Sequence, residues 1–174
     1  IPLTADWWQE IRNGIEASDT FIFIISPDSL ASPIAAMEIS HAVQNNKRLM
    51  PIVLATPDEA KAFERLAQRP LDDNIRAALN GRDVISLARE NWQSLARHNW
   101  LIFDNEELFD TNLKNLLEAL DTDLDHVRTH TRLLIRARAW ESNAQNRSFL
   151  LRGDDLNAAE AWAQASAGKR PEIT

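Results

Sequence analysis

The chain has 174 residues, of which 44% are hydrophobic, and it contains no cysteine. This length allows one domain with an appendage, and the lack of cysteine excludes disulfides and thiolate metal sites. The net charge of −7 disfavours nonspecific binding to nucleic acids or anionic membranes, and no apolar run approaches the roughly 20 residues of a membrane-spanning helix.

The first predicted element is a short amphipathic helix. Thr4 or Asp6 can cap its start, and Trp7, Ile11 and Ile15 then recur every four residues. This spacing gives the helix a single apolar stripe.

A strand is predicted next, at residues 20–26. The run is rich in β-branched and aromatic residues and has no polar alternation, so we expect a strand buried on both faces. A turn signal, Ser26-Pro27-Asp28, ends it. A helix over 33–45 follows, in which Ser32 caps the free amides and Pro33 takes the first helical position.

Glu38 lies one turn inside this second helix, on one face with Ile34 and His41. Open α/β sheets usually keep their chemistry just past the carboxyl edge of a central strand, which is where this carboxylate falls. From spacing alone, a solvated helix carboxylate is the more common interpretation. Ala35 is expected to face the core, together with Ile39, Ala42 and Val43.

The remaining elements of the first 120 residues continue the alternation of helix and strand. We expect a strand at 48–54 weakened by Pro51, a helix from a capping box at Thr56 to Gln68, and a short helix at 72–80. Residues 82–98 give no clear pattern. A short strand at 100–103 precedes a helix at 106–120 whose apolar stripe should face the core; its members are Phe109, Leu113, Leu116, Leu117 and Leu120. This order predicts a parallel sheet with helices on its faces.

The last part of the chain is predicted to be helical. One long helix at 121–140 is followed by a polar break, a second helix at 155–167 and a linker. His126 and His130 have metal-ligand spacing but lack a third ligand, so solvated or partner-facing histidines are favoured. Arg128, Arg132 and Arg136 are expected to pair with the acidic side chains between residues 106 and 125.

Several of these motifs, in this order, resemble the TIR (Toll/interleukin-1 receptor) domain. The resemblance is closest to bacterial TIR proteins. It rests on four elements: the Trp7-Trp8 helix, the strand that ends at Ser26-Pro27, the Ser32 to Ile39 helix with Glu38, and the Asn99 to Phe103 strand. It implies an α/β, flavodoxin-like parallel sheet over residues 1–120. Residues 121–174 would form a helical connector towards a further module. The family's first strand, first helix and second strand have no counterpart here, so we expect the N-terminal part of the domain to be absent.

The resemblance also implies a chemistry. In TIR enzymes the glutamate at the position of Glu38 is needed to cleave the nicotinamide–ribose bond of NAD, which would be a substrate here, with no cofactor and no metal. The implied substrate contacts are Ile34, Ser32, His41 and Trp8. Isoleucine and alanine stand at positions 34 and 35, where the family often has Trp and Cys. Ile34 could therefore line the site or simply pack against a neighbour.

The implied role is an NAD-cleaving effector in prokaryotic immunity or signalling, such as antiviral defence. Self-assembly with other TIR domains would activate it, and a sensor module in the same or a partner chain would provide the trigger. We expect a cytoplasmic location, no direct nucleic-acid partner and no membrane segment. The alternative is a non-catalytic TIR scaffold that mediates TIR–TIR interaction.

Overall fold

The computed structural model of the chain describes residues 7–173. The caps predicted at Thr4 or Asp6 lie outside these residues. In chain order the elements are α1 (Trp7–Ala17), β1 (Thr20–Ile25), α2 (Pro27–Leu30), α3 (Pro33–Gln44), β2 (Arg48–Val53), α4 (Glu59–Gln68), α5 (Asp73–Leu79), α6 (Val84–Leu95), β3 (Leu101–Ile102), the 3-10 turn η1 (Glu106–Leu108), α7 (Phe109–Asp121), α8 (Leu124–Ser142), the 3-10 turn η2 (Arg147–Phe149) and α9 (Asp154–Gln164).

The described strands form a parallel sheet in the order β1-β2-β3. β1 pairs with β2 along its whole length, from Thr20 opposite Arg48 to Ile25 opposite Val53. β3 pairs only with Ile52 and Val53, so Pro51 lies where β2 has one strand neighbour rather than two. The predicted strand at 48–54 therefore forms despite its proline.

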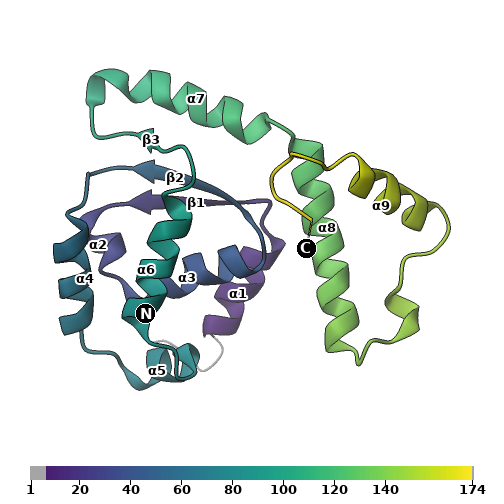
Figure 1. Cartoon of the computed structure of the whole chain (residues 1–174), viewed down its shortest axis with the longest axis horizontal. Coiled ribbons are helices and arrows are strands. Elements are labelled where there is room, and N and C mark those ends of the chain that lie inside the picture. The colour runs from purple at the N-terminus through teal and green to yellow at the C-terminus, as the bar shows by residue number, and fades with distance from the viewer. Residues whose placement is uncertain (1–6, 174) are drawn as a thin grey trace.

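The helices form layers around this sheet. Figure 1 shows α1, α3 and α6 on one side of the sheet, α7 next to β3 at the end of the strand order, and α8 and α9 as a pair beside the sheet domain. The chain thus has the predicted α/β, flavodoxin-like parallel sheet with a C-terminal helical extension.

The core lies between the sheet and the helices of the first face. One cluster joins the inward side chains of β1 and β2 to α3, and includes Ile25, Ala35 and Leu95. A second cluster lies among α1, α3, α4, α5 and α6 and includes Trp7 and Leu66. The core position predicted for Ala35 is confirmed, but Val43 is exposed rather than buried.

The other face of the sheet is open, which corrects two predictions. Ile22 and Ile24 of β1 are 41% and 50% exposed, so this strand is buried on one face only. In α7 only Leu116 of the predicted core stripe is buried, and Leu117 is 54% exposed. The physical reason is that α7 contacts β3 at the end of the sheet and leaves β1 uncovered.

One helix start needs correction, and the structure shows a helix in a stretch for which none was predicted. The capping residue of α4 is Asp58, not Thr56, because the Asp58 carboxylate accepts the Lys61 N–H. The uninterpreted stretch 82–98 contains α6, whose buried row is interrupted by a polar residue, Asn91. The Asn91 side chain donates to the carbonyl of Ala36 at 2.7 Å, so this amide is buried without leaving its donor unsatisfied.

The predicted helices at 106–120 and 121–140 are both present, as α7 and α8. α7 ends at Asp121, and Asp123 adopts a left-handed conformation with φ of 52° before α8 begins. The segment after α9 returns to the start of α8, where Lys169 pairs with Asp123 at 3.0 Å. Between residues 7 and 173 no helix has the length and apolar character that crossing a membrane requires.

Candidate functional site

The candidate site lies along the exposed stripe of α3. From Pro33 to Ala42 the helix is buried except at Ile34, Glu38 and His41. Their spacing of four and then three residues places them on one face, as predicted. A ligand can therefore reach α3 along this face, in addition to its exposed last two residues, Val43 and Gln44.

The start of α3 is fixed by capping groups at the carboxyl end of β1. The Ser32 hydroxyl accepts a hydrogen bond from the Ala35 N–H at 3.3 Å, and Ser26 and Ser29 form a reciprocal capping box at the start of α2. Ser32 is thus positioned by the helix end that it caps, six residues before Glu38 on the chain.

The Glu38 side chain is half-buried on this stripe. None of its interactions with residues 7–173 is a hydrogen bond or an ion pair, and burial raises the pKa of its carboxyl group. A carboxylate kept partly from water and left without a counter-charge has its full charge available to a cationic group.

Polar contacts with α1 and with the end of α3 hold His41 in place. Its Nε2 lies 2.9 Å from a carboxylate oxygen of Glu16 on α1, and the Asn45 side chain donates to the His41 carbonyl at 2.8 Å. Burial lowers the pKa of the His41 imidazole, against the opposing effect of Glu16. The ring is therefore fixed in orientation and close to an acceptor.

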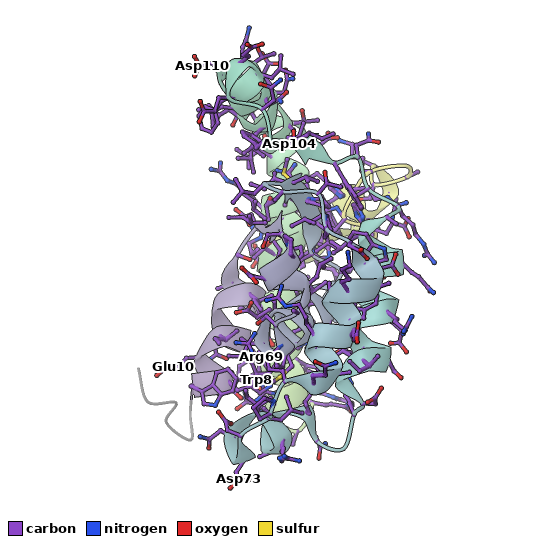
Figure 2. All side chains as sticks on the ribbon, turned by 90° about the vertical axis from the view of Figure 1, so that its left-hand side faces the viewer. Trp8, Glu10, Arg69, Asp73, Asp104 and Asp110 are labelled. Atoms are coloured by element: carbon purple, nitrogen blue, oxygen red, sulfur yellow. The ribbon has the colours of Figure 1, made fainter. Side chains whose placement is uncertain are left out.

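Trp8 extends the site onto α1. Its ring meets His41 edge-on, with centroids 5.9 Å apart, and the Arg12 guanidinium lies 6.0 Å from the same indole. Figure 2 shows Trp8 at the end of the molecule where Asp73 also lies, far from Asp104 and Asp110. The structure thus brings Trp8 to His41, next to the α3 stripe, while Ser32 remains at the start of α3.

A basic cleft that the sequence analysis did not identify lies at the carboxyl end of β1. Its volume is about 460 Å³, and its walls are Asp28, Ala31, Arg65, Gln68 and Arg69. Arg69 donates to the Ala31 carbonyl at 3.2 Å, one residue before Ser32, and Arg65 pairs with Asp28 at 2.7 Å. The spacing of the two arginines by four residues was the available sequence signal.

On α8 the prediction of solvated or partner-facing histidines is wrong, and Arg128 and Arg136 form ion pairs with partners other than those predicted. His126 and His130 are buried, because Trp162 of α9 covers both rings, at 5.1 and 6.4 Å between centroids. Arg128 and Arg136 pair with Asp19 and Asp155, which lie outside the predicted acidic stretch. Among the described residues, no group of three or more potential metal ligands occurs.

Comparison with known proteins identifies one family. The family model described as TIR domain matches residues 1–83, a range that contains all five predicted site residues. No curated protein and no solved structure gives a significant match to the chain.

Proposed function

Residues 1–83 belong to the TIR domain family, and from this premise we propose that the chain cleaves NAD, with Glu38 as the catalytic carboxylate. The observation that carries the proposal is the state of Glu38 on α3, which is half-buried and, within residues 7–173, has no counter-charge. We further propose that the domain extends to about residue 120, because β3 pairs with β2 and α7 follows directly.

The reaction requires little beyond a negative charge. The bond between ribose C1′ and the nicotinamide nitrogen breaks, and its electron pair leaves with nicotinamide as a neutral molecule. The ribose passes through an oxocarbenium-like state, which a nearby carboxylate stabilises. Water then adds at C1′ and releases a proton to solvent, or a nucleophile within the substrate adds to give a cyclised product.

In this proposal the residues around Glu38 bind the substrate. Ile34 supplies apolar contact, and the Trp8 indole supplies the π-face that isoleucine lacks. His41 and Ser32 offer hydrogen bonds to the sugar, and the cleft with Arg65 and Arg69 suits the pyrophosphate, because guanidinium groups bind phosphate oxygens in pairs.

The biological setting proposed here follows from family membership alone. The enzyme would act as an effector in prokaryotic immunity or signalling and would assemble with other TIR domains. A sensor module would control this assembly, and the proposed location is the cytoplasm. NAD is the substrate, and no cofactor is required.

One observation favours a second candidate function, a non-catalytic TIR scaffold. Ile34 packs against the core cluster that includes Met37 and Phe63. A side chain committed to this packing contributes less to a substrate pocket. In a scaffold, the α3 stripe would serve protein contacts instead of NAD.

The test is NAD turnover by the full-length protein in its assembled state, with nicotinamide release followed by chromatography. Glu38→Gln should lower turnover by at least tenfold, which corresponds to about 1.4 kcal/mol in the barrier. Glu90→Gln is the matched control, since Glu90 is an exposed helical glutamate on α6. An assembled wild-type protein that releases no nicotinamide would support the scaffold.

The pH profile gives an independent readout. Glu38 must be ionised to stabilise the cation, and burial raises its pKa. Turnover should therefore fall as the pH drops through this raised pKa, at a higher pH than for an ordinary glutamate. A rate that stays constant down to the usual pKa of glutamate would contradict the role of Glu38.

A further inference from the structure

A large apolar cavity lies in the C-terminal helical extension, outside the residues that match the TIR family. Its volume is about 620 Å³, within the range of small-molecule sites. α8, η2 and α9 form its walls, with Leu134, Trp140, Phe149, Leu156 and Trp162 among the lining side chains. Neither the proposed NAD site nor its residues take part in this cavity.

Several buried polar groups in the cavity wall have no hydrogen-bond partner among the described residues. The indole nitrogens of Trp140 and Trp162 and both ring nitrogens of His130 are buried, and no hydrogen-bond partner for them occurs among the described residues. Buried polar groups are nearly always paired, and an unpaired one costs about 1–3 kcal/mol. A ligand acceptor that pairs with one of these indole N–H groups would remove this cost.

The cavity carries almost no net charge. Arg136 is the charged side chain in its lining, and its guanidinium pairs with Asp155 at 3.3 Å. Burial, together with Lys47 and His126, lowers the pKa of His130 to about 4, so its imidazole is neutral at physiological pH. A charged ligand would find no free counter-ion and would lose its hydration, whereas a neutral ligand avoids this cost.

We propose that this cavity binds an uncharged, largely apolar small molecule that carries a hydrogen-bond acceptor such as a carbonyl. The apolar body would pack against the leucine and aromatic side chains, and the acceptor would face Trp140 or Trp162. This site would make the C-terminal extension a ligand-binding unit attached to the TIR domain.

The probe for this site is Nile red, which is neutral, apolar and carries a carbonyl group. Full-length protein should bind one molecule saturably, with a blue shift of its emission and energy transfer from tryptophan. Ala163→Trp fills the cavity from α9 and should weaken binding at least tenfold. Ala161→Trp is the matched control, since Ala161 lies on the same helix but does not line the cavity.

Two further variants keep the test decisive. Ala137→Leu fills the same cavity from α8 and should also weaken binding, which covers the case in which Ala163→Trp fails to fold by circular dichroism. Ile24→Thr alters the open sheet face, the other apolar surface that could bind the dye, and should leave affinity unchanged. Absence of saturable binding, equal loss with Ala161→Trp, or loss with Ile24→Thr would overturn the site.

The proposed hydrogen bond to the ligand's acceptor is tested by removing the indole N–H donors while keeping aromatic side chains in the cavity wall. The double variant Trp140→Phe, Trp162→Phe should bind Nile red at least threefold more weakly, as expected for a lost hydrogen bond. Its affinity for diphenylhexatriene, which has no acceptor, should stay the same. Equal effects on both dyes would overturn the acceptor requirement.

Discussion

The sheet domain and the helices after it are packed in different ways. In the sheet domain, Ile25, Leu66 and Leu95 are completely or almost completely buried and belong to two large clusters. In α7, Leu113 and Leu117 have the same periodic spacing but are exposed. α8 and α9 enclose a cavity instead of a packed core.

This difference shows what an apolar period can predict. The periodic spacing of apolar residues predicts that a helix has one apolar face. It does not predict whether another element covers that face. α3 and α6 are covered by the sheet and by each other, whereas α7 contacts little more than β3 and η1. Surface left open in this way is available for partners or ligands.

The sharpest test compares one leucine from each region. Leu95→Ala removes a fully buried side chain from the core of the sheet domain and should lower the free energy of unfolding by about 2–5 kcal/mol. Leu117→Ala, on the exposed face of α7, should change it by less than about 0.5 kcal/mol. Urea denaturation of both variants gives the comparison, and similar losses would show that a partner surface covers α7 in solution.

The second prediction concerns the dependence of stability on pH, which the C-terminal extension should dominate. Burial, followed by Lys47 and His126, lowers the folded-state pKa of His130 to about 4 from an ordinary value of 6.5. The unfolded chain therefore binds a proton first as the pH falls. Stability should be full above pH 6.5 and decline by up to about 3 kcal/mol towards pH 4.

Urea denaturation between pH 7 and 4.5 measures this decline, and NMR titration of the His130 ring gives its midpoint. His130→Leu removes the titrating group and should flatten the curve over that range. An unchanged curve in this variant would assign the pH dependence to other groups.

Local chemistry made the first part of the chain predictable. Ser32-Pro33 marks a helix start, and the spacing of Ile34, Glu38 and His41 gives one face, both of which the structure contains. α6 was missed because its buried row contains Asn91, whose role depends on a carbonyl in α3, 55 residues away. Whether the five predicted residues form a substrate site remains a prediction.

Long-range contacts made the last part unpredictable. His126 and His130 look like surface residues in sequence, because the tryptophan that covers them lies more than thirty residues later. The basic cleft with Arg65 and Arg69 likewise depends on α2, which contains Asp28, packing against α4. The periodicity and spacing of residues describe one helix or strand at a time. The buried histidines and the basic cleft each depend on the packing of two elements.

A third prediction tests the contact that joins the two regions. Arg138 of α8 donates to the Asn45 side chain at 2.9 Å, at the end of the helix that carries Glu38 and His41. Arg138→Met keeps the apolar stem but leaves a buried Asn45 oxygen unpaired, and should cost about 1–2 kcal/mol. Arg132→Met is the control, since Arg132 is an exposed arginine on the same helix. Equal melting temperatures for the two variants would show that the regions are not coupled through this contact.

The smallest expected effect concerns the stability of Glu38→Gln. Because burial raises the folded-state pKa of Glu38, its ionised form costs stability above that pKa, and protonation at low pH removes the cost. Gln keeps the shape of the side chain without its charge, so the variant should melt slightly higher at pH 7, by no more than about 0.5 kcal/mol in free energy. This gain should vanish as the pH falls and wild-type Glu38 becomes protonated. A variant that instead melts lower at pH 7 would indicate that the carboxylate makes a stabilising contact, and Glu38 would then be part of the packed region rather than a free charge on its surface.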